Sequence, residues 1–332
     1  MIESIQFQNF KVLRDTTLPL GRCTILVGPN GSGKSTVLQA LEAVREPQSV
    51  SYPSLVTVGI PQTEGQAVEV RFNWGDPHRG VAPFAQWTQD GNRKRGVHVS
   101  EGAAESRSQI NHVIPGIRIF SFDARAVAGP AAVSDKAELG TDGSNLAAVL
   151  DRLRDEEPDR FDAVNSQLGQ WLPEFDCILF ERPHQGKKSI ALRTREGHYG
   201  IPASDLSQGT LIALALLTLA YLPDPPPLIG LEEPDRGIHP RLLRHVKDAL
   251  HRLSHPESCG EKREPIQVIA TTHNPYFLDL FKPEEIVIAN RLDQEVRFER
   301  LSEQSNIDEI LGDAPLGEAW YTGILGGVPS KP

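Results

Sequence analysis

Residues 27–36 read Val-Gly-Pro-Asn-Gly-Ser-Gly-Lys-Ser-Thr, and this stretch decides the fold of the chain. Its spacing fits the phosphate-binding pattern G-x-x-x-x-G-K-S/T. The apolar, β-branched run at 23–27 predicts a buried strand before it, and the apolar spacing over 35–44 predicts a helix after it. A strand, this loop and a helix in direct succession favour a phosphate-binding loop over a chance Gly-Ser turn.

The chemistry of this loop follows from its residue types. Glycines allow the backbone to curl so that successive N–H groups face a phosphate, and the helix directs its positive end to the same anion. Lys34 can reach the β- and γ-phosphates, and the Ser35 hydroxyl can bind Mg²⁺. The residues predicted to hold ATP here are Gly28, Pro29, Asn30, Gly31, Ser32, Gly33, Lys34, Ser35 and Thr36.

The composition is that of an ordinary soluble protein. Of 332 residues, 39% are hydrophobic and 23% charged, and no apolar run approaches the ~20 residues that span a bilayer. The start at 1–5 lacks a signal-like core, and Cys23, Cys177 and Cys259 lack metal-ligand spacing. We therefore expect a cytoplasmic protein without membrane contact. The net charge of −10 argues against a surface built wholly for DNA, although it leaves room for a local basic groove.

The order of the predicted elements indicates an α/β fold. Strands alternate with apolar helices after residue 206, which predicts a largely parallel sheet covered on both faces. The predicted core strands are at 2–10, 23–27, 228–231, 266–270 and 285–289, and a second short strand is predicted to end at 18–21. The predicted helices of this part are at 206–222 and 241–253, and a further helix starts at 276–281.

We expect one domain over 1–332, with 1–46 and 206–300 forming the nucleotide-binding core. The segment 47–122 is predicted to be an inserted, irregular β-rich lobe, and 139–205 a helical subdomain. In the lobe we predict strands at 56–60, 67–74 and 117–122, and we favour a solvated hairpin tip over a nucleic-acid contact for Arg93-Lys94-Arg95. In the subdomain we predict helices at 145–150, capped by Asp142-Gly143-Ser144, and 158–171, and strands at 176–180 and 189–195.

Two adjacent carboxylates follow the predicted strand at 228–231. Open α/β sheets bind ligands at the carboxyl ends of their strands, so we expect Glu232 and Glu233 beside the phosphate loop. Phosphoryl transfer needs an acid that holds Mg²⁺ and a group that orients or deprotonates the attacking water. We assign the metal to Glu232, with Ser35, and the water to Glu233. Without the phosphate loop, the two would be interpreted as solvated acids.

His273 leaves the next predicted strand, at 266–270, where its imidazole can hydrogen-bond the γ-phosphate and respond to its loss. The predicted catalytic set is therefore Glu233, His273 and Lys34. For His239 we favour a structural role at the start of a helix.

Residues 206–210, Leu-Ser-Gln-Gly-Thr, open an apolar helix. The Ser207 hydroxyl, the backbone at Gly209 and the helix dipole offer a second phosphate cradle, although a plain helix cap would use the same residues. Two cradles in one chain predict a head-to-tail dimer with two-fold symmetry, in which each protomer caps the nucleotide of its partner.

Together these motifs resemble the ABC-type ATPase heads of the RecF/SMC class, in particular the bacterial predicted AAA-family ATPases related to the OLD proteins. The resemblance covers Met1 to about Asn290. It rests on Gly-Pro-Asn-Gly-Ser-Gly-Lys-Ser-Thr at 28–36, Leu-Ser-Gln-Gly-Thr at 206–210, Leu-Ile-Gly-Leu-Glu-Glu-Pro-Asp-Arg-Gly-Ile-His-Pro at 228–240 and Thr-Thr-His-Asn-Pro at 271–275, with Asn9-Phe10-Lys11 and Gly143-Ser144-Asn145-Leu146 as supporting matches.

The resemblance implies a P-loop NTPase fold with an ABC-ATPase-like core, and roles for the matching residues. These are Walker A at 28–36, the ABC signature at 206–210 with Ser207 and Gly209 on the nucleotide, Walker B at 228–233 with Glu233 as catalytic glutamate, the D-loop at 235–239, His273 as switch histidine, and Lys11 as a basic residue approaching the nucleotide.

The chain departs from the family pattern at several places. Glu232 stands where many relatives carry Asp, and Gln208 where transporter ATPases carry Gly. The Q-loop glutamine stays open among Gln62, Gln66 and Gln86. OLD proteins carry a Toprim nuclease domain after the ATPase, whereas 274–332 shows no acidic nuclease cluster, so we expect a head without its own nuclease.

We therefore expect an ATPase that uses ATP and Mg²⁺, forms a homodimer on ATP and works with DNA or a nuclease partner in DNA repair or phage defence. The pathway rests on the resemblance alone. Two alternatives stay open, an ABC transporter ATPase subunit and a slow ATP-gated scaffold. A kinase fits poorly, because the sequence shows no acceptor site.

Overall fold

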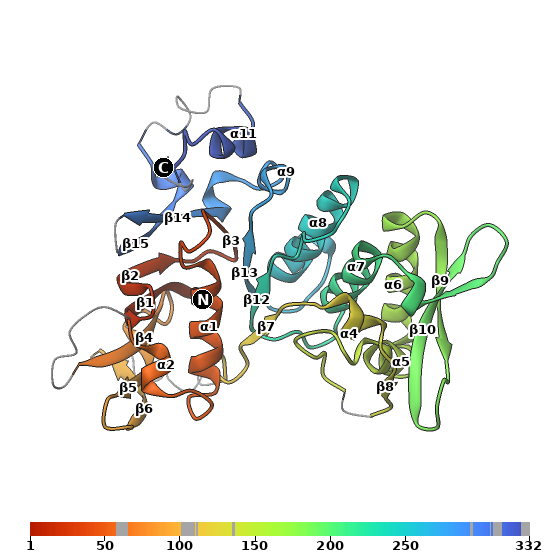
Figure 1. The fold of residues 1–332 in the computed structure, drawn as a ribbon, viewed down its shortest axis with the longest axis horizontal. Coiled ribbons are helices and arrows are strands. Elements are labelled where there is room, and N and C mark those ends of the chain that lie inside the picture. Colours follow the sequence, from red (N-terminus) through yellow and green to blue (C-terminus); the bar gives the residue numbers. More distant parts are fainter. Residues whose placement is uncertain are drawn as a thin grey trace. The chain divides into compact units, whose positions relative to one another are not determined.

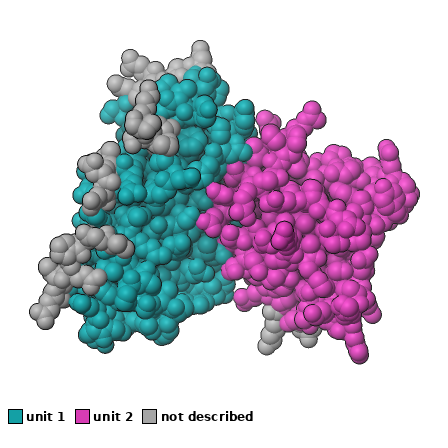
Figure 2. Space-filling model, in the orientation of Figure 1, with its two compact units in different colours: residues 1–119, 226–231, 265–332 teal, residues 120–225, 232–264 magenta. Residues whose placement is uncertain are grey.

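The computed structural model describes residues 1–57, 66–100, 110, 112–134, 137–292, 295–305, 307 and 314–326. The chain divides into two compact units, which Figure 2 colours separately, and each is described by itself. Unit 1 comprises Met1–Ile119, Pro226–Leu231 and Pro265–Pro332, and unit 2 comprises Phe120–Pro225 and Glu232–Glu264. The subdivision into core, lobe and helical subdomain stays a prediction.

A six-stranded sheet, ordered β15-β14-β3-β13-β12-β7, lies mainly in unit 1 (Figure 1). Strands β14, β3 and β13 run parallel, and β15 is antiparallel to β14. Every residue of β3 and β13 is buried, as expected for parallel strands covered on both faces. The strands are β3 (Cys23–Val27), β7 (Arg118–Phe120), β12 (Leu228–Glu232), β13 (Gln267–Thr272), β14 (Ile286–Leu292) and β15 (Glu295–Arg300).

The second sheet of unit 1 is antiparallel and ordered β2-β1-β4-β5-β6. Because β1 pairs with both β2 and β4, the β-rich segment after α1 (Lys34–Arg45) shares a sheet with the amino-terminal strands. The predicted strand at 56–60 lies partly outside the described residues, and Val56 forms an isolated bridge with Phe10. The strands are β1 (Ile2–Phe10), β2 (Leu13–Pro19), β4 (Ala67–Trp74), β5 (Val81–Thr88) and β6 (Arg93–Val99).

Helix α1 (Lys34–Arg45) belongs to a core that contains side chains from both sheets. Its apolar residues recur at helical spacing, so Val37, Leu41 and Val44 lie on one buried face. They share this core with Phe7 of β1 and Ile269 of β13. Burying one such Leu or Val side chain contributes about 1.5–3 kcal/mol. The described part of unit 1 also contains the helices α2 (Tyr52–Leu55), α9 (Pro275–Leu278) and α11 (Leu316–Tyr321) and the short 3-10 turns η4 (Pro283–Glu285) and η5 (Leu301–Glu303).

Unit 2 combines helices with a small antiparallel sheet around β10. Helix α7 (Gln208–Ala220) is buried from Gly209 to Ala220, because it is apolar on all sides. The other helices are α4 (Ala124–Ala128), α5 (Leu146–Glu156), α6 (Pro158–Trp171) and α8 (Leu243–Ser254), with 3-10 turns η1 (Ala203–Asp205), η2 (Pro240–Leu242) and η3 (Pro256–Cys259). The strands are β8 (Ala131–Ala132), β9 (Phe175–Glu181), β10 (Lys187–Thr194) and β11 (Gly200–Pro202).

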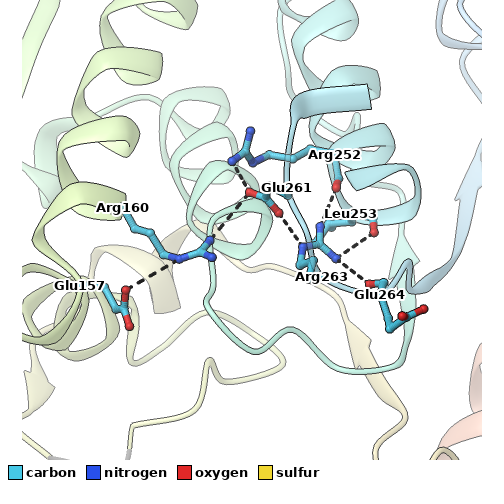
Figure 3. Close-up of polar contacts among 7 residues, drawn as sticks. All are labelled: Glu157, Arg160, Arg252, Leu253, Glu261, Arg263 and Glu264. Carbon is cyan, nitrogen blue, oxygen red and sulfur yellow. Dashed lines mark hydrogen bonds and ion pairs between the residues drawn. The ribbon is translucent and has the colours of Figure 1, made fainter. Parts of the chain in front are cut away.

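In unit 2, the carboxylate of Glu261 forms polar contacts with three arginines (Figure 3). Glu261 accepts a hydrogen bond from Arg263 Nε at 2.7 Å and another from Arg252 of α8, and forms an ion pair with Arg160 of α6 at 3.8 Å. Arg263 also donates to the backbone oxygens of Arg252 and Leu253, at 2.5 and 3.1 Å. The cluster therefore fastens the segment after α8 to two helices.

Apart from the strand at 56–60, the predicted strands and helices occur in the predicted order. Two local predictions are wrong. Arg93, Lys94 and Arg95 lie in β6 rather than at a hairpin tip, since the turn between β5 and β6 precedes them. The cap of α5 is Asn145, not the segment 142–144, and its side chain accepts from Gly140 N at 2.7 Å. The strands β5, β6, β8, β11 and β15 and the helices α2, α4 and α11 were not predicted from the sequence. Within the described ranges, no helix combines the length and apolar character required to cross a membrane.

Candidate active site

The loop between β3 and α1 folds around the Lys34 side chain. Lys34 is the first residue of α1 and only 5% exposed. Its Nζ donates to the backbone oxygens of Gly28 and Pro29, at 2.8 and 2.9 Å, and lies 3.5 Å from Ser32 Oγ. The ammonium group therefore sits within the curve of the loop, where a phosphate can take over these hydrogen bonds.

Glycine is required at position 28 because the loop lies very close to the backbone of the neighbouring strand. A Cβ atom at this position would lie 2.4 Å from the backbone oxygen of Ala289 in β14 and 2.9 Å from Ser32 Oγ. Any side chain would therefore push the loop away from the sheet. The curled loop and the buried lysine fit the phosphates of Mg-ATP. The hydroxyl of Ser35, at the start of α1, fits its cation.

His273 follows the strand next to the one that leads into the loop. Strands β13 and β3 are parallel, and Thr272 pairs with Val27, so the two strands end level with each other. Two hydrogen bonds of the next residue, Asn274, fix the path of the chain after β13. Asn274 N donates to Thr272 Oγ1 at 3.0 Å, and Asn274 Oδ1 accepts from Tyr276 N at 3.1 Å as the cap of α9. This positioning role was not predicted from the sequence, although Asn before Pro is a recognisable helix-start signal.

Lys11 lies in the connection between β1 and β2, with a positive φ of 50°. Its backbone N–H donates to Leu55 O at 2.7 Å, and its Nζ donates to Gln39 Oε1 of α1 at 2.7 Å. The loop therefore places this lysine against the helix that begins at Lys34. Its contact with a nucleotide stays a prediction.

Strand β12 ends at Glu232, where the chain enters unit 2, and Glu233 comes directly after it. Glu233 has a φ of 44°, in the left-handed region that a non-glycine residue adopts at a cost of about 1–3 kcal/mol. Its backbone oxygen accepts from Arg236 N at 2.9 Å, which closes a turn. Such strain is retained mostly where function needs a particular side-chain direction.

The segments 206–210 and 235–239 contact each other within unit 2. Ser207 caps α7, because its Oγ accepts from Thr210 N at 3.1 Å. A Cβ atom on Gly209 would lie 2.5 Å from Gly237 O, so glycine is needed for this backbone approach. His239 caps η2 by accepting from Arg241 N at 3.2 Å, which confirms its predicted structural role.

Replacing Gly209 by alanine is expected to destabilise unit 2 by about 1–3 kcal/mol, because the added methyl group displaces the Gly237 turn. Alanine has a higher helix propensity than glycine, so a loss of stability would indicate the close contact between Gly209 and Gly237. The measurement is the free energy of unfolding. Gly200→Ala is the control, since its Cβ would meet only the flexible Leu179 side chain at 3.2 Å and Ala191 Cβ at 3.7 Å. Equal stability of the two variants would contradict the packing role.

The predicted site residues are thus divided between the units. Unit 1 carries 28–36, Lys11 and His273, whereas Glu232, Glu233, Ser207 and Gly209 belong to unit 2. Of the Q-loop candidates, Gln86 donates to Glu69 Oε2 at 3.2 Å, the backbone oxygen of Gln66 accepts from Tyr52, and Gln62 lies outside the described residues.

A phosphate loop between β3 and α1, with a polar corner at the end of the neighbouring parallel strand, defines a P-loop ATPase of the AAA/ABC class. Residues 23–279 match the family described as "AAA domain, putative AbiEii toxin, Type IV TA system", and the chain belongs to this family.

Individual relatives agree with that class. The chain is 24% identical over 377 residues to "OLD nuclease" of Thermus scotoductus (strain ATCC 700910 / SA-01), covering 97% of this chain and 69% of the relative. The fold is similar to an SMC head bound to the C-winged helix domain of ScpA, with a TM-score of 0.64 at 15% identity, covering 92% of this chain and 99% of that one. It is also similar to the SMC head domain from Thermotoga maritima, with a TM-score of 0.55 at 15% identity, covering 90% and 98%. The expected resemblance to OLD-related ABC-type heads is confirmed.

Proposed function

We propose that this protein is an ATP-hydrolysing head that dimerises around ATP and acts in DNA repair or phage defence with DNA or a nuclease partner. The observation that supports hydrolysis best is the Lys34 ammonium group, which is buried in the loop on the oxygens of Gly28 and Pro29. The nuclease partner is inferred from the OLD nuclease relative, and the pathway rests on the resemblance of the motifs to OLD-related heads.

In this proposal each residue has one task. Mg-ATP supplies the γ-phosphoryl group and a cation that neutralises its charge. Lys34 would exchange its backbone acceptors for β- and γ-phosphate oxygens, and Ser35 and Glu232 would hold Mg²⁺. Glu233 orients the attacking water and accepts its proton, and His273 hydrogen-bonds the γ-phosphate.

The dimer is proposed from the second cradle. Ser207 and Gly209 lie at the amino end of α7, a helix of 13 residues whose dipole favours an anion there. A two-fold axis would place this cradle of one protomer on the nucleotide of the other, so that ATP joins the pair.

Lys34→Ala is expected to lower ATP turnover by about 10²–10³-fold, because a preorganised donor to the transferred phosphoryl group is lost. Phosphate release at saturating Mg-ATP measures the effect. Lys282→Ala, which removes an exposed lysine of unit 1, is the matched control.

Undiminished turnover in Lys34→Ala would contradict the proposed site. A wild-type protein that binds ATP without releasing phosphate would instead favour the ATP-gated scaffold. Copurification with a membrane permease would favour the transporter subunit.

A further inference from the structure

A pocket of about 490 Å³ opens in unit 1 where α1 ends beside β6, two elements labelled in Figure 1. It belongs neither to the phosphate loop nor to any residue assigned a catalytic task above. Its lining is Arg45, Glu46, Pro47, Gln48, Ser49, Arg93, Lys94 and Arg95.

The lining is strongly positive in a chain whose net charge is −10. It holds four cations and one carboxylate, and Arg45 uses that carboxylate in an ion pair with Glu46 at 3.0 Å. The exposed cations Arg93, Lys94 and Arg95 remain, and no carboxylate in the described part of the chain forms an ion pair with them. Lys94 Nζ lies 5.9 Å from the centroid of the Phe84 ring, a contact that does not neutralise its charge. The charges of these three adjacent residues are therefore not balanced by a carboxylate.

Backbone oxygens hold the two guanidinium groups in place. Arg95 donates to Val44 O, and to Arg45 O at 2.5 Å, at the end of α1, and Arg93 Nη1 donates to Gln48 O at 3.2 Å. Burial lowers the pKa of the Arg95 guanidinium group, which still stays protonated at neutral pH. Because these acceptors are uncharged, they orient the arginines without neutralising them.

We propose that this pocket binds the phosphate backbone of double-stranded nucleic acid. Guanidinium groups match phosphate oxygens by paired hydrogen bonds, and repeated phosphates engage several cations at once. The lining contains no aromatic side chain on which the bases of a single strand could stack, so a duplex is favoured and sequence is not read. The inference rests on the DNA partner of the proposed function and says where that partner binds.

Helix α1 separates this pocket from the phosphate loop. It runs over 12 residues from Lys34 to Arg45, about 18 Å at 1.5 Å per residue. Substitutions on β6 therefore leave the loop around Lys34 unchanged, and duplex binding can be tested separately from ATP hydrolysis.

The test uses Arg93→Gln combined with Lys94→Gln, which removes two charges and leaves the contacts of Arg95 with α1 intact. Binding of a fluorescent duplex is measured by anisotropy between about 50 and 200 mM salt. We expect the slope of log affinity against log salt to become less steep by about 2, with the same loss of affinity for unrelated duplex sequences. Arg297→Gln is the control, because Arg297 is an exposed strand arginine of unit 1 that already pairs with Glu295 at 3.7 Å.

Four results would overturn the proposal, and the first three concern duplex binding. These are a wild-type protein that does not bind duplex, a double variant with the wild-type slope and affinity, and a preference for an acidic peptide over duplex. The fourth result concerns the Lys34→Ala variant. If this variant binds ATP or inorganic phosphate, and if the added β6 substitutions abolish that binding, the proposal is rejected, because the pocket would then bind free phosphate compounds. ATP turnover without DNA is recorded in parallel, so a failure of the ATPase proposal is seen separately from a failure of duplex binding.

Discussion

Glu233→Gln is expected to lower ATP turnover by about 10²–10⁴-fold, because the amide cannot accept a proton from the attacking water. ATP should still bind, since the phosphate loop around Lys34 is unchanged. The hydrolysis-blocked protein should therefore accumulate in its nucleotide-bound form. If ATP joins two protomers, the mass of Glu233→Gln in solution should double on addition of Mg-ATP.

Two further variants complete this experiment. Adding Ser207→Arg should abolish the ATP-dependent dimer, because a bulky cation replaces the hydroxyl at the amino end of α7. Glu264→Gln removes another carboxylate of unit 2 that has no assigned task, and should behave as wild type. A Glu233→Gln protein that binds ATP and stays monomeric would reject the sandwich for the isolated chain, and wild-type turnover would reject the role of Glu233.

Glu261→Ala is expected to lower the free energy of unfolding of unit 2 by about 2–3 kcal/mol, because Arg252 and Arg263 lose their shared acceptor. The side chains of Glu261 and Arg263 are 13% and 14% exposed, so water replaces the lost carboxylate poorly. Arg252 would keep its stacking on Tyr221, whose ring centroid lies 3.9 Å from the guanidinium carbon. Hydrogen exchange of amides in α8 gives the local free energy.

The neighbouring carboxylate provides a matched comparison. Arg263 Nη1 donates to the backbone oxygen of Glu264 at 3.5 Å. Glu264→Ala should therefore keep this contact and lower the free energy of unfolding only slightly. Glu261→Gln should fall between the two, because it keeps one acceptor oxygen and loses the charge. Equal protection of α8 in Glu261→Ala and Glu264→Ala would show that the cluster in Figure 3 does not stabilise unit 2.

Local sequence patterns predicted the elements that carry the phosphate loop. The run at 23–27 is apolar apart from Thr24, and the structure contains it as β3, buried throughout. Pro158 marks the start of α6, because proline fixes the backbone of a first helical turn. For Arg93–Arg95 the local pattern predicted the wrong structure. A run of charged residues is compatible with a turn and also with a strand whose arginines hydrogen-bond to the end of a helix far away in the sequence.

The sequence by itself determined that a phosphate loop stands between a buried strand and a helix, because glycine spacing and apolar periodicity act over a few neighbouring residues. It also determined that His273 follows a buried strand. Only the tertiary structure decided that β13 ends level with β3, that the β-rich segment continues the sheet of β1, and that Gly209 lies against Gly237. Those features depend on strand register and backbone approach between residues far apart in the chain, which no local pattern encodes.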